Sequence, residues 1–137
     1  MPFDSATLRL ENAAGQVFTH PAGYVVFIYK PGPRTLADLQ ALIIRVGELL
    51  RAYHWHRILG DQHQMAPLAP AQADWLVQHW QQYTRHHGPL YAAVVLAQDV
   101  FARLAAGQLK QQISETGITY RQFADANAAQ AWLAQIA

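Results

Sequence analysis

The 137-residue sequence contains no cysteine, and only 14% of its residues are charged. The absence of cysteine excludes a disulfide, a thiolate metal site and a cysteine nucleophile. The formal net charge is +1 with the cationic residues scattered along the chain, so there is no basic surface of the kind that binds nucleic acid. No apolar run approaches the roughly 20 residues that a membrane-spanning helix needs. We therefore expect no nucleic-acid partner and no stable insertion into a membrane.

Features that direct a protein out of the cytoplasm are also missing. Residues 1–7 lack the basic and apolar regions of a signal peptide. Together with the absence of cysteine, this predicts a soluble cytoplasmic protein. Hydrophobic residues make up 52% of the chain, which is enough for the core of one globular domain over residues 1–137.

The first part of the chain predicts strands followed by a long helix. Residues 8–10 and 17–18 are apolar in alternation around a turn at 12–15, which predicts a hairpin. Residues 24–29 form a continuous β-branched and aromatic run, typical of a strand covered on both faces. Thr35 offers an N-cap for a helix over 36–53, whose apolar residues recur at helical spacing. Gly47 inside that helix costs about 1 kcal/mol relative to alanine, which indicates a close contact at this position.

The rest of the chain alternates strands with helices. We predict strands at 57–61, 91–97 and 119–123 and a helix from Pro70 to about His87. A third helix is capped by Asp99 and ended by Gly117, and a last helix is capped by Asp125. The order β-β-β-α-β-α-β-α-β-α implies right-handed crossovers. The sequence therefore predicts an α/β fold with a single mixed sheet flanked by about four helices.

Several of these segments resemble the SpoIIAA-like branch of the STAS superfamily, which is related to the anti-sigma-factor antagonists. The resemblance lies in residues 24–30, the helix after Thr35, 57–61 with its proline-rich turn, 92–96, 99–104, 120–123 and 131–133. It covers nearly the whole chain and consists of packing motifs rather than catalytic ones. It implies a bacterial, non-enzymatic domain that binds a protein partner or a small ligand and needs no cofactor.

The turn before the second helix departs from the pattern of that family. In the anti-sigma-factor antagonists, a serine or threonine in this turn is phosphorylated to switch partner binding. Residues 62–74 here contain no serine, threonine or tyrosine, so we expect no such switch. The fold also resembles lipid-transfer domains of the CRAL-TRIO type, which implies an apolar ligand beneath the third helix, over residues 99–113.

We expect the ligand or partner to bind at the turn after strand 57–61, the start of the second helix and the third helix, because open α/β sheets bind ligands beyond the carboxyl ends of their strands. Trp75 with Met65 and Leu68 would form an exposed apolar patch for a partner or a second copy of the chain. The alternative is that Trp75 and Trp80 are one boundary and one core residue. The predicted binding residues are Asp61, Gln62, His63, Met65, Leu68, Trp75, Phe101 and Leu104.

A metal-binding or enzymatic site is the main alternative to this binding domain. His54 and His56 share a face at a predicted strand edge, and with His63 and Asp61 they could hold Zn²⁺ or Cu²⁺. No histidine pair at helical spacing completes a known metal motif, so we expect partly exposed polar residues instead. For Asp61 we expect a turn-capping role and for Asp99 an N-cap. A homodimer formed through the apolar patch is a third alternative.

Overall fold

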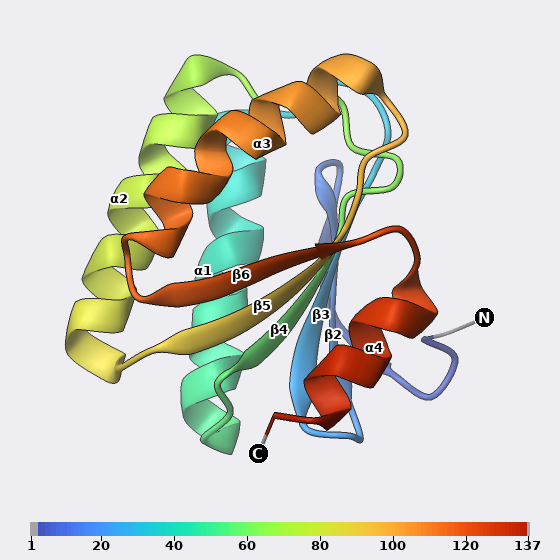
Figure 1. Cartoon of the computed structure of the whole chain (residues 1–137), viewed down its shortest axis with the longest axis vertical. Helices are drawn as coiled ribbons and strands as arrows, with labels where there is room; N and C mark the ends of the chain where they lie inside the picture. Colours follow the sequence, from blue (N-terminus) through green and yellow to red (C-terminus); the bar gives the residue numbers. More distant parts are fainter. Residues whose placement is uncertain (1–2, 137) are drawn as a thin grey trace.

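A computed structural model describes residues 3–136 of the chain. It confirms the predicted α/β fold, with one mixed six-stranded sheet and four helices in the predicted order (Figure 1). The elements are β1 (Thr7–Asn12), β2 (Gly15–His20), β3 (Tyr24–Tyr29), α1 (Leu36–Tyr53), β4 (Arg57–Asp61), α2 (Pro70–His87), β5 (Leu90–Val95), α3 (Val100–Ser114), β6 (Ile118–Phe123) and α4 (Ala126–Ala134).

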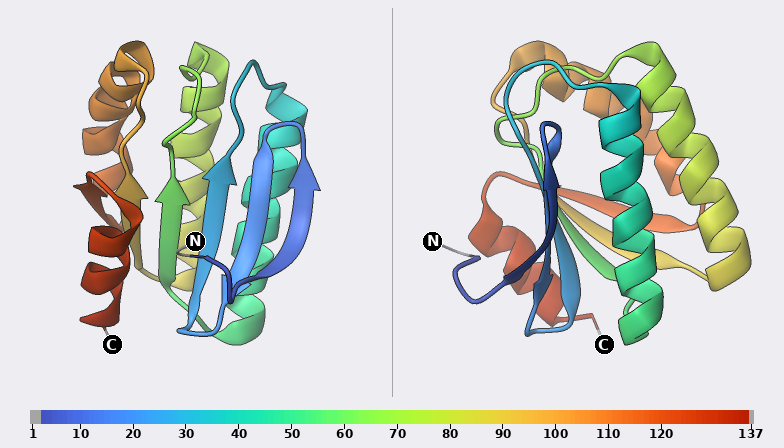
Figure 2. Two further views of the ribbon diagram at one scale, coloured as in Figure 1. Left: turned by 90° about the vertical axis from the view of Figure 1, so that its right-hand side faces the viewer. Right: turned by 180° about the vertical axis from the view of Figure 1, so that it is seen from behind.

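The strands lie in the sheet in the same order as in the sequence. β1, β2 and β3 pair antiparallel, and β3, β4, β5 and β6 pair parallel. Each of the crossovers through α1, α2 and α3 therefore advances one strand in a constant direction. Right-handed crossovers of constant direction place their helices on one face of the sheet. Figures 1 and 2 show α1, α2 and α3 on that face and α4 on the opposite one.

The sheet has a hydrophobic layer on each face. The larger layer packs against α1, α2 and α3, and the smaller one packs against α4. Adjacent residues of β3 enter different layers, since Val25 belongs to the first and Val26 to the second, and both are fully buried. This confirms the prediction that the strand at residues 24–29 is covered on both faces.

Helix α1 begins and ends as its sequence predicts. The Thr35 Oγ1 atom accepts a hydrogen bond from the Asp38 amide at 3.1 Å, which satisfies one free N–H of the first turn. The close contact predicted at Gly47 is confirmed, because a Cβ atom there would lie 2.9 Å from Cε2 of Tyr83 on α2. His54 follows the helix in the left-handed conformation, with φ of 58°. No helix within residues 3–136 is both long and apolar enough to cross a membrane.

Strand β5 differs from its predicted bounds of 91–97, since it covers Leu90–Val95. Ala97 lies beyond the strand, on the connection to α3, and is fully buried as part of the larger layer. The apolar run therefore marked burial rather than strand pairing. Strand β6 begins one residue earlier than predicted, at Ile118, which pairs with Leu90.

Candidate ligand-binding site

A cavity of about 100 Å³ lies between the sheet and α3. We call it the α3 cavity. Its position corresponds to the place where the CRAL-TRIO resemblance implies an apolar ligand. Its walls come from β3, β4, β5, β6, the turn after β4 and the helices α1, α2 and α3. The lining residues are Phe27, Tyr29, Ile43, Ile58, Gly60, Gln62, Leu68, Leu76, Trp80, Ala92, Val94, Ala106, Leu109, Ile113, Ile118 and Tyr120.

Small residues leave this space open. Gly60 on β4, Ala92 on β5 and Ala106 on α3 all line the cavity and contribute almost no side-chain volume to it. Protein interiors are otherwise packed to the density of organic crystals. Replacement of any of these three by a larger apolar residue would fill space that the fold leaves empty.

One polar group in the cavity wall has no partner. Gln62 is 9% exposed, and its Nε2 atom donates a hydrogen bond of 3.4 Å to the Tyr120 hydroxyl. Its Oε1 atom is buried and accepts no hydrogen bond from residues 3–136. A buried acceptor without a donor costs about 1–3 kcal/mol. The amide oxygen is therefore an unused hydrogen-bond acceptor on a residue of the cavity wall.

The tyrosine hydroxyl groups of the cavity wall stay neutral at physiological pH. Burial raises the pKa of Tyr120 to about 12. Burial also raises the pKa of Tyr29 well above its ordinary value, although the Arg34 guanidinium, 5.4 Å from the centre of the Tyr29 ring, opposes this shift. No residue with a charged side chain lines the cavity. The cavity is thus suited to a neutral molecule.

Arg34 fixes the turn that carries Gln62 and Leu68. Its Nη2 atom donates to the Ala66 carbonyl at 2.6 Å, and its Nη1 atom donates to Gln72 Oε1 at 3.1 Å. Gln72 Nε2 donates back to the Arg34 carbonyl at 2.9 Å. The sequence analysis missed both residues. They lie 38 positions apart, and no local pattern indicates that they pair.

Known proteins give no guide to the occupant of the α3 cavity. No family model, curated protein or solved structure matches this chain. The resemblance to the SpoIIAA-like family therefore stays a prediction that depends on packing motifs. The class of ligand has to be inferred from the chemistry of the cavity itself.

The residues predicted around the turn after β4 have different environments. Asp61 has the predicted turn-capping role, because its Oδ1 atom accepts a hydrogen bond from the His63 amide at 2.9 Å. The His63 side chain is exposed. Of the predicted binding residues, Gln62 and Leu68 line the α3 cavity.

The exposed patch predicted at Met65, Leu68 and Trp75 is wrong. Met65 is 1% exposed and belongs to the larger core layer, and Leu68 and Trp75 pack against the same layer. Trp75 is half-buried, whereas Trp80 is buried. The alternative of one boundary and one core tryptophan is therefore confirmed.

Phe101 and Leu104 do not line the α3 cavity. They are 73% and 60% exposed, whereas Ala102 and Ala106 on the same helix are buried. They therefore do not contact a molecule inside this cavity, and their role in binding a ligand or a partner stays a prediction. Together with Val100, which is 66% exposed, they form an apolar surface on the outer side of the helix. We call it the α3 outer surface.

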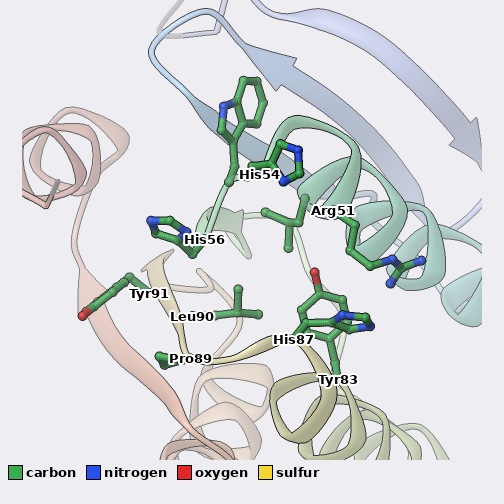
Figure 3. A pocket seen from close by; sticks show the side chains of 10 residues that line it. Arg51, His54, His56, Tyr83, His87, Pro89, Leu90 and Tyr91 are labelled. Carbon is green, nitrogen blue, oxygen red and sulfur yellow. The ribbon is translucent and has the colours of Figure 1, made fainter.

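The residues of the alternative metal site lie at opposite ends of β4. His54 and His56 precede the strand, and Asp61 and His63 lie at and after its other end. At about 3.3 Å per residue, the pair His54 and His56 is separated from the pair Asp61 and His63 by roughly 20 Å. Figure 3 shows His54 and His56 at a hollow on their own end of the sheet. Within residues 3–136, no three histidine, aspartate or glutamate side chains are grouped to hold a metal ion. The four residues thus do not form one site.

Proposed function

We propose that this protein is a non-enzymatic binding domain of the SpoIIAA-like type that takes a small apolar molecule into the α3 cavity. The observation that carries this proposal is an apolar cavity with one unpaired polar atom, Gln62 Oε1. A molecule with a hydrocarbon body and one hydroxyl group satisfies both features. Its body gains about 25 cal/mol for each Å² of apolar surface removed from water. Its hydroxyl group donates to the Gln62 oxygen.

The composition of the cavity wall supports binding without catalysis. The wall contains no serine, histidine, lysine or carboxylate. A nucleophile together with an adjacent base is what covalent catalysis requires. The only groups able to form hydrogen bonds through side chains are Gln62, Trp80 and the two tyrosines, and these groups orient a ligand.

The size of the cavity limits the ligand to a small ring or a short branched chain. An apolar cavity of about 150 Å³ is enough to bind benzene. The α3 cavity is somewhat smaller, at about 100 Å³, so a ring requires a small outward movement of α3. This helix is held over the cavity partly by Ala102 and Ala106, which bury little apolar area. We therefore expect α3 to be the element that moves when a ligand enters.

Phenol and toluene test the proposal, because they have similar sizes and phenol carries a hydroxyl group where toluene carries a methyl group. We expect phenol to bind about tenfold more tightly than toluene by isothermal titration calorimetry, since it pairs a buried acceptor. Gln62→Met removes the amide oxygen and keeps the apolar volume, so it should abolish this preference. Gln64→Met is the matched control, because Gln64 lies in the same turn, is exposed and does not line the cavity.

Two results would contradict different parts of the proposal. If neither compound binds, the α3 cavity is not a ligand site. If both bind equally in the wild-type protein, the cavity takes apolar molecules but Gln62 does not select among them. Native mass spectrometry of the purified protein gives an independent check, because a retained ligand adds mass that disappears on denaturation.

The α3 outer surface favours a second function, the binding of a protein partner or of a second copy of the chain. Val100, Phe101 and Leu104 are all more than half exposed on adjacent turns of one helix. Clustered exposed apolar residues are typical of interaction sites. A homodimer predicts a sedimentation mass that falls on dilution and a monomeric Phe101→Ser variant. A wild-type protein that is monomeric at every concentration would exclude the homodimer.

A further inference from the structure

A second hollow, of about 770 Å³, opens at the opposite end of the sheet from the turn after β4. It lies where α1 and α2 end and where β4 and β5 begin, and it shares no lining residue with the α3 cavity. We call it the histidine hollow. Figure 3 shows Arg51, His54, His56 and His87 around it. Its volume falls within the range of about 300–1,000 Å³ that is usual for small-molecule sites.

The histidine hollow contains an arginine that no carboxylate neutralises. Arg51 is exposed at its wall, and its guanidinium group lies 5.7 Å from the centre of the Tyr83 ring. No carboxylate of residues 3–136 forms an ion pair with it, and no acidic residue lines the hollow. The planar guanidinium group is matched to a carboxylate, which it can bind through two parallel hydrogen bonds.

The free carbonyl groups at the ends of α1 and α2 would oppose an anion, but several of them are already satisfied. The amides of His54 and Trp55 donate to the Arg51 and Leu50 carbonyls at 3.3 and 2.9 Å. The Gly88 amide donates to the Thr84 carbonyl at 2.9 Å. These bonds reduce the negative potential of the two helix ends. The Arg51 guanidinium group, which lies against the Tyr83 ring, is therefore the charged group that would pair with a bound anion.

Aromatic side chains form much of the remaining wall. Trp55 and Tyr91 are half-buried there, and the buried Tyr83 ring contacts the His87 ring at a centroid distance of 4.8 Å. Leu90, which is buried, adds an aliphatic side chain. Such walls favour a flat, apolar body, because aromatic rings prefer stacked or edge-to-face contacts with one another.

We propose that the histidine hollow binds a small aromatic carboxylate. Arg51 pairs with the carboxylate group, and the ring of the ligand lies against Leu90 and the neighbouring rings of Tyr83 and His87. The ionisable groups that face the hollow are Arg51 and His54 from the end of α1, His56 before β4, Tyr83 and His87 from α2, and Tyr91 from β5.

The test compares 2-naphthoate with its neutral analogue 2-naphthamide. We expect the carboxylate to bind about tenfold more tightly than the amide by isothermal titration calorimetry at neutral pH, as a charge-assisted pair predicts. Amide resonances in NMR spectra should shift for His56 and Tyr91 and stay unchanged for Gln62.

Matched variants identify the group that binds the carboxylate. Arg51→Gln should remove the preference for naphthoate, whereas Arg45→Gln should keep it, because Arg45 lies on the same helix, pairs with Glu48 and does not line the hollow. Equal affinities for naphthoate and naphthamide, the absence of binding, or an unchanged preference in a folded Arg51→Gln protein would each overturn the proposal.

Discussion

Ala106→Val tests whether the α3 cavity is truly unfilled. Ala106 is 3% exposed and lines the cavity, and valine adds two methyl groups at this position. Burial of each carbon contributes about 0.8 kcal/mol, so the pair contributes about 1.6 kcal/mol. The lower helix propensity of valine costs roughly 0.6 kcal/mol. We therefore expect the free energy of unfolding to rise by about 1 kcal/mol, while phenol no longer binds.

Urea denaturation followed by tryptophan fluorescence measures this change, because Trp80 lines the same cavity. Ala105→Val is the matched control, since residue 105 is adjacent on α3, is half-buried and does not line the cavity. Ala105→Val has the same loss of helix propensity but places no methyl group in the cavity, so its free energy of unfolding should be unchanged or lower. If Ala106→Val lowers the free energy of unfolding by more than the control does, valine does not fit at this position and the reasoning fails.

Two further predictions concern packing and pH. Gly47→Ala should lower the free energy of unfolding measured in urea, because a methyl group 2.9 Å from Tyr83 Cε2 overpacks α1 against α2. Such overpacking costs about 1–3 kcal/mol, whereas the gain in helix propensity is about 1 kcal/mol. A clearly stabilised variant would contradict this prediction. Because the folded pKa of Tyr120 is raised to about 12 from an ordinary value near 10, its contribution to stability is complete below about pH 10 and is lost as the pH rises toward 12. Tyr120→Phe should therefore flatten the loss of stability over this range, and an unchanged slope of stability against pH would refute the linkage.

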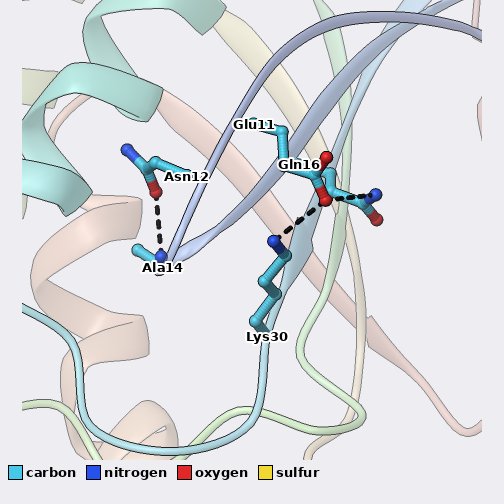
Figure 4. Close-up of polar contacts among 5 residues, drawn as sticks. All are labelled: Glu11, Asn12, Ala14, Gln16 and Lys30. Carbon is cyan, nitrogen blue, oxygen red and sulfur yellow. Dashed lines mark hydrogen bonds and ion pairs between the residues drawn. The ribbon is translucent and has the colours of Figure 1, made fainter.

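The starts of the helices and the hairpin turn could be predicted because their signals are local. The carboxylates of Asp99 and Asp125 accept hydrogen bonds of 2.8 Å from the amides of Ala102 and Ala128, three residues further on. The hairpin turn at 12–15 is equally local, since Asn12 Oδ1 accepts a bond of 2.8 Å from the Ala14 amide (Figure 4). Each of these contacts lies within four residues of sequence, where composition and spacing are informative.

The orientation of α3 was harder to predict, because its sequence contains two apolar stripes. Large side chains at Phe101 and Leu104 suggest one inner face, whereas the other begins at Ala102 and Ala106 and continues through Leu109 and Ile113. The structure buries the second stripe, whose helical spacing extends to the end of the helix. The first stripe stops at Gln108. The stripe whose apolar residues keep helical spacing to the end of α3 is thus the buried one, although the other stripe has the larger side chains.

The contacts that build the α3 cavity gave no local signal. The hydrogen bond from Gln62 to Tyr120 joins residues 58 positions apart, and it depends on the parallel register of β4, β5 and β6. The prediction that Gln62 and Leu68 are site residues came from their place after a strand, and both line the cavity. The amide oxygen of Gln62 that lacks a donor became evident only from the packed structure.

Helix α2 borders both proposed sites, as α1 and β5 also do, and its side chains offer a route by which the sites could communicate. Leu76 and Trp80 line the α3 cavity, and Tyr83 and His87, one and two turns further on, line the histidine hollow. The rings of Trp80 and Tyr83 are in contact, with centroids 5.5 Å apart. Contact alone does not couple two sites, because coupling requires an element with two arrangements that both ligands bias. Since α3 rather than α2 is expected to move, phenol and 2-naphthoate should bind independently, and a change in naphthoate affinity when phenol saturates the cavity would show that α2 moves as well.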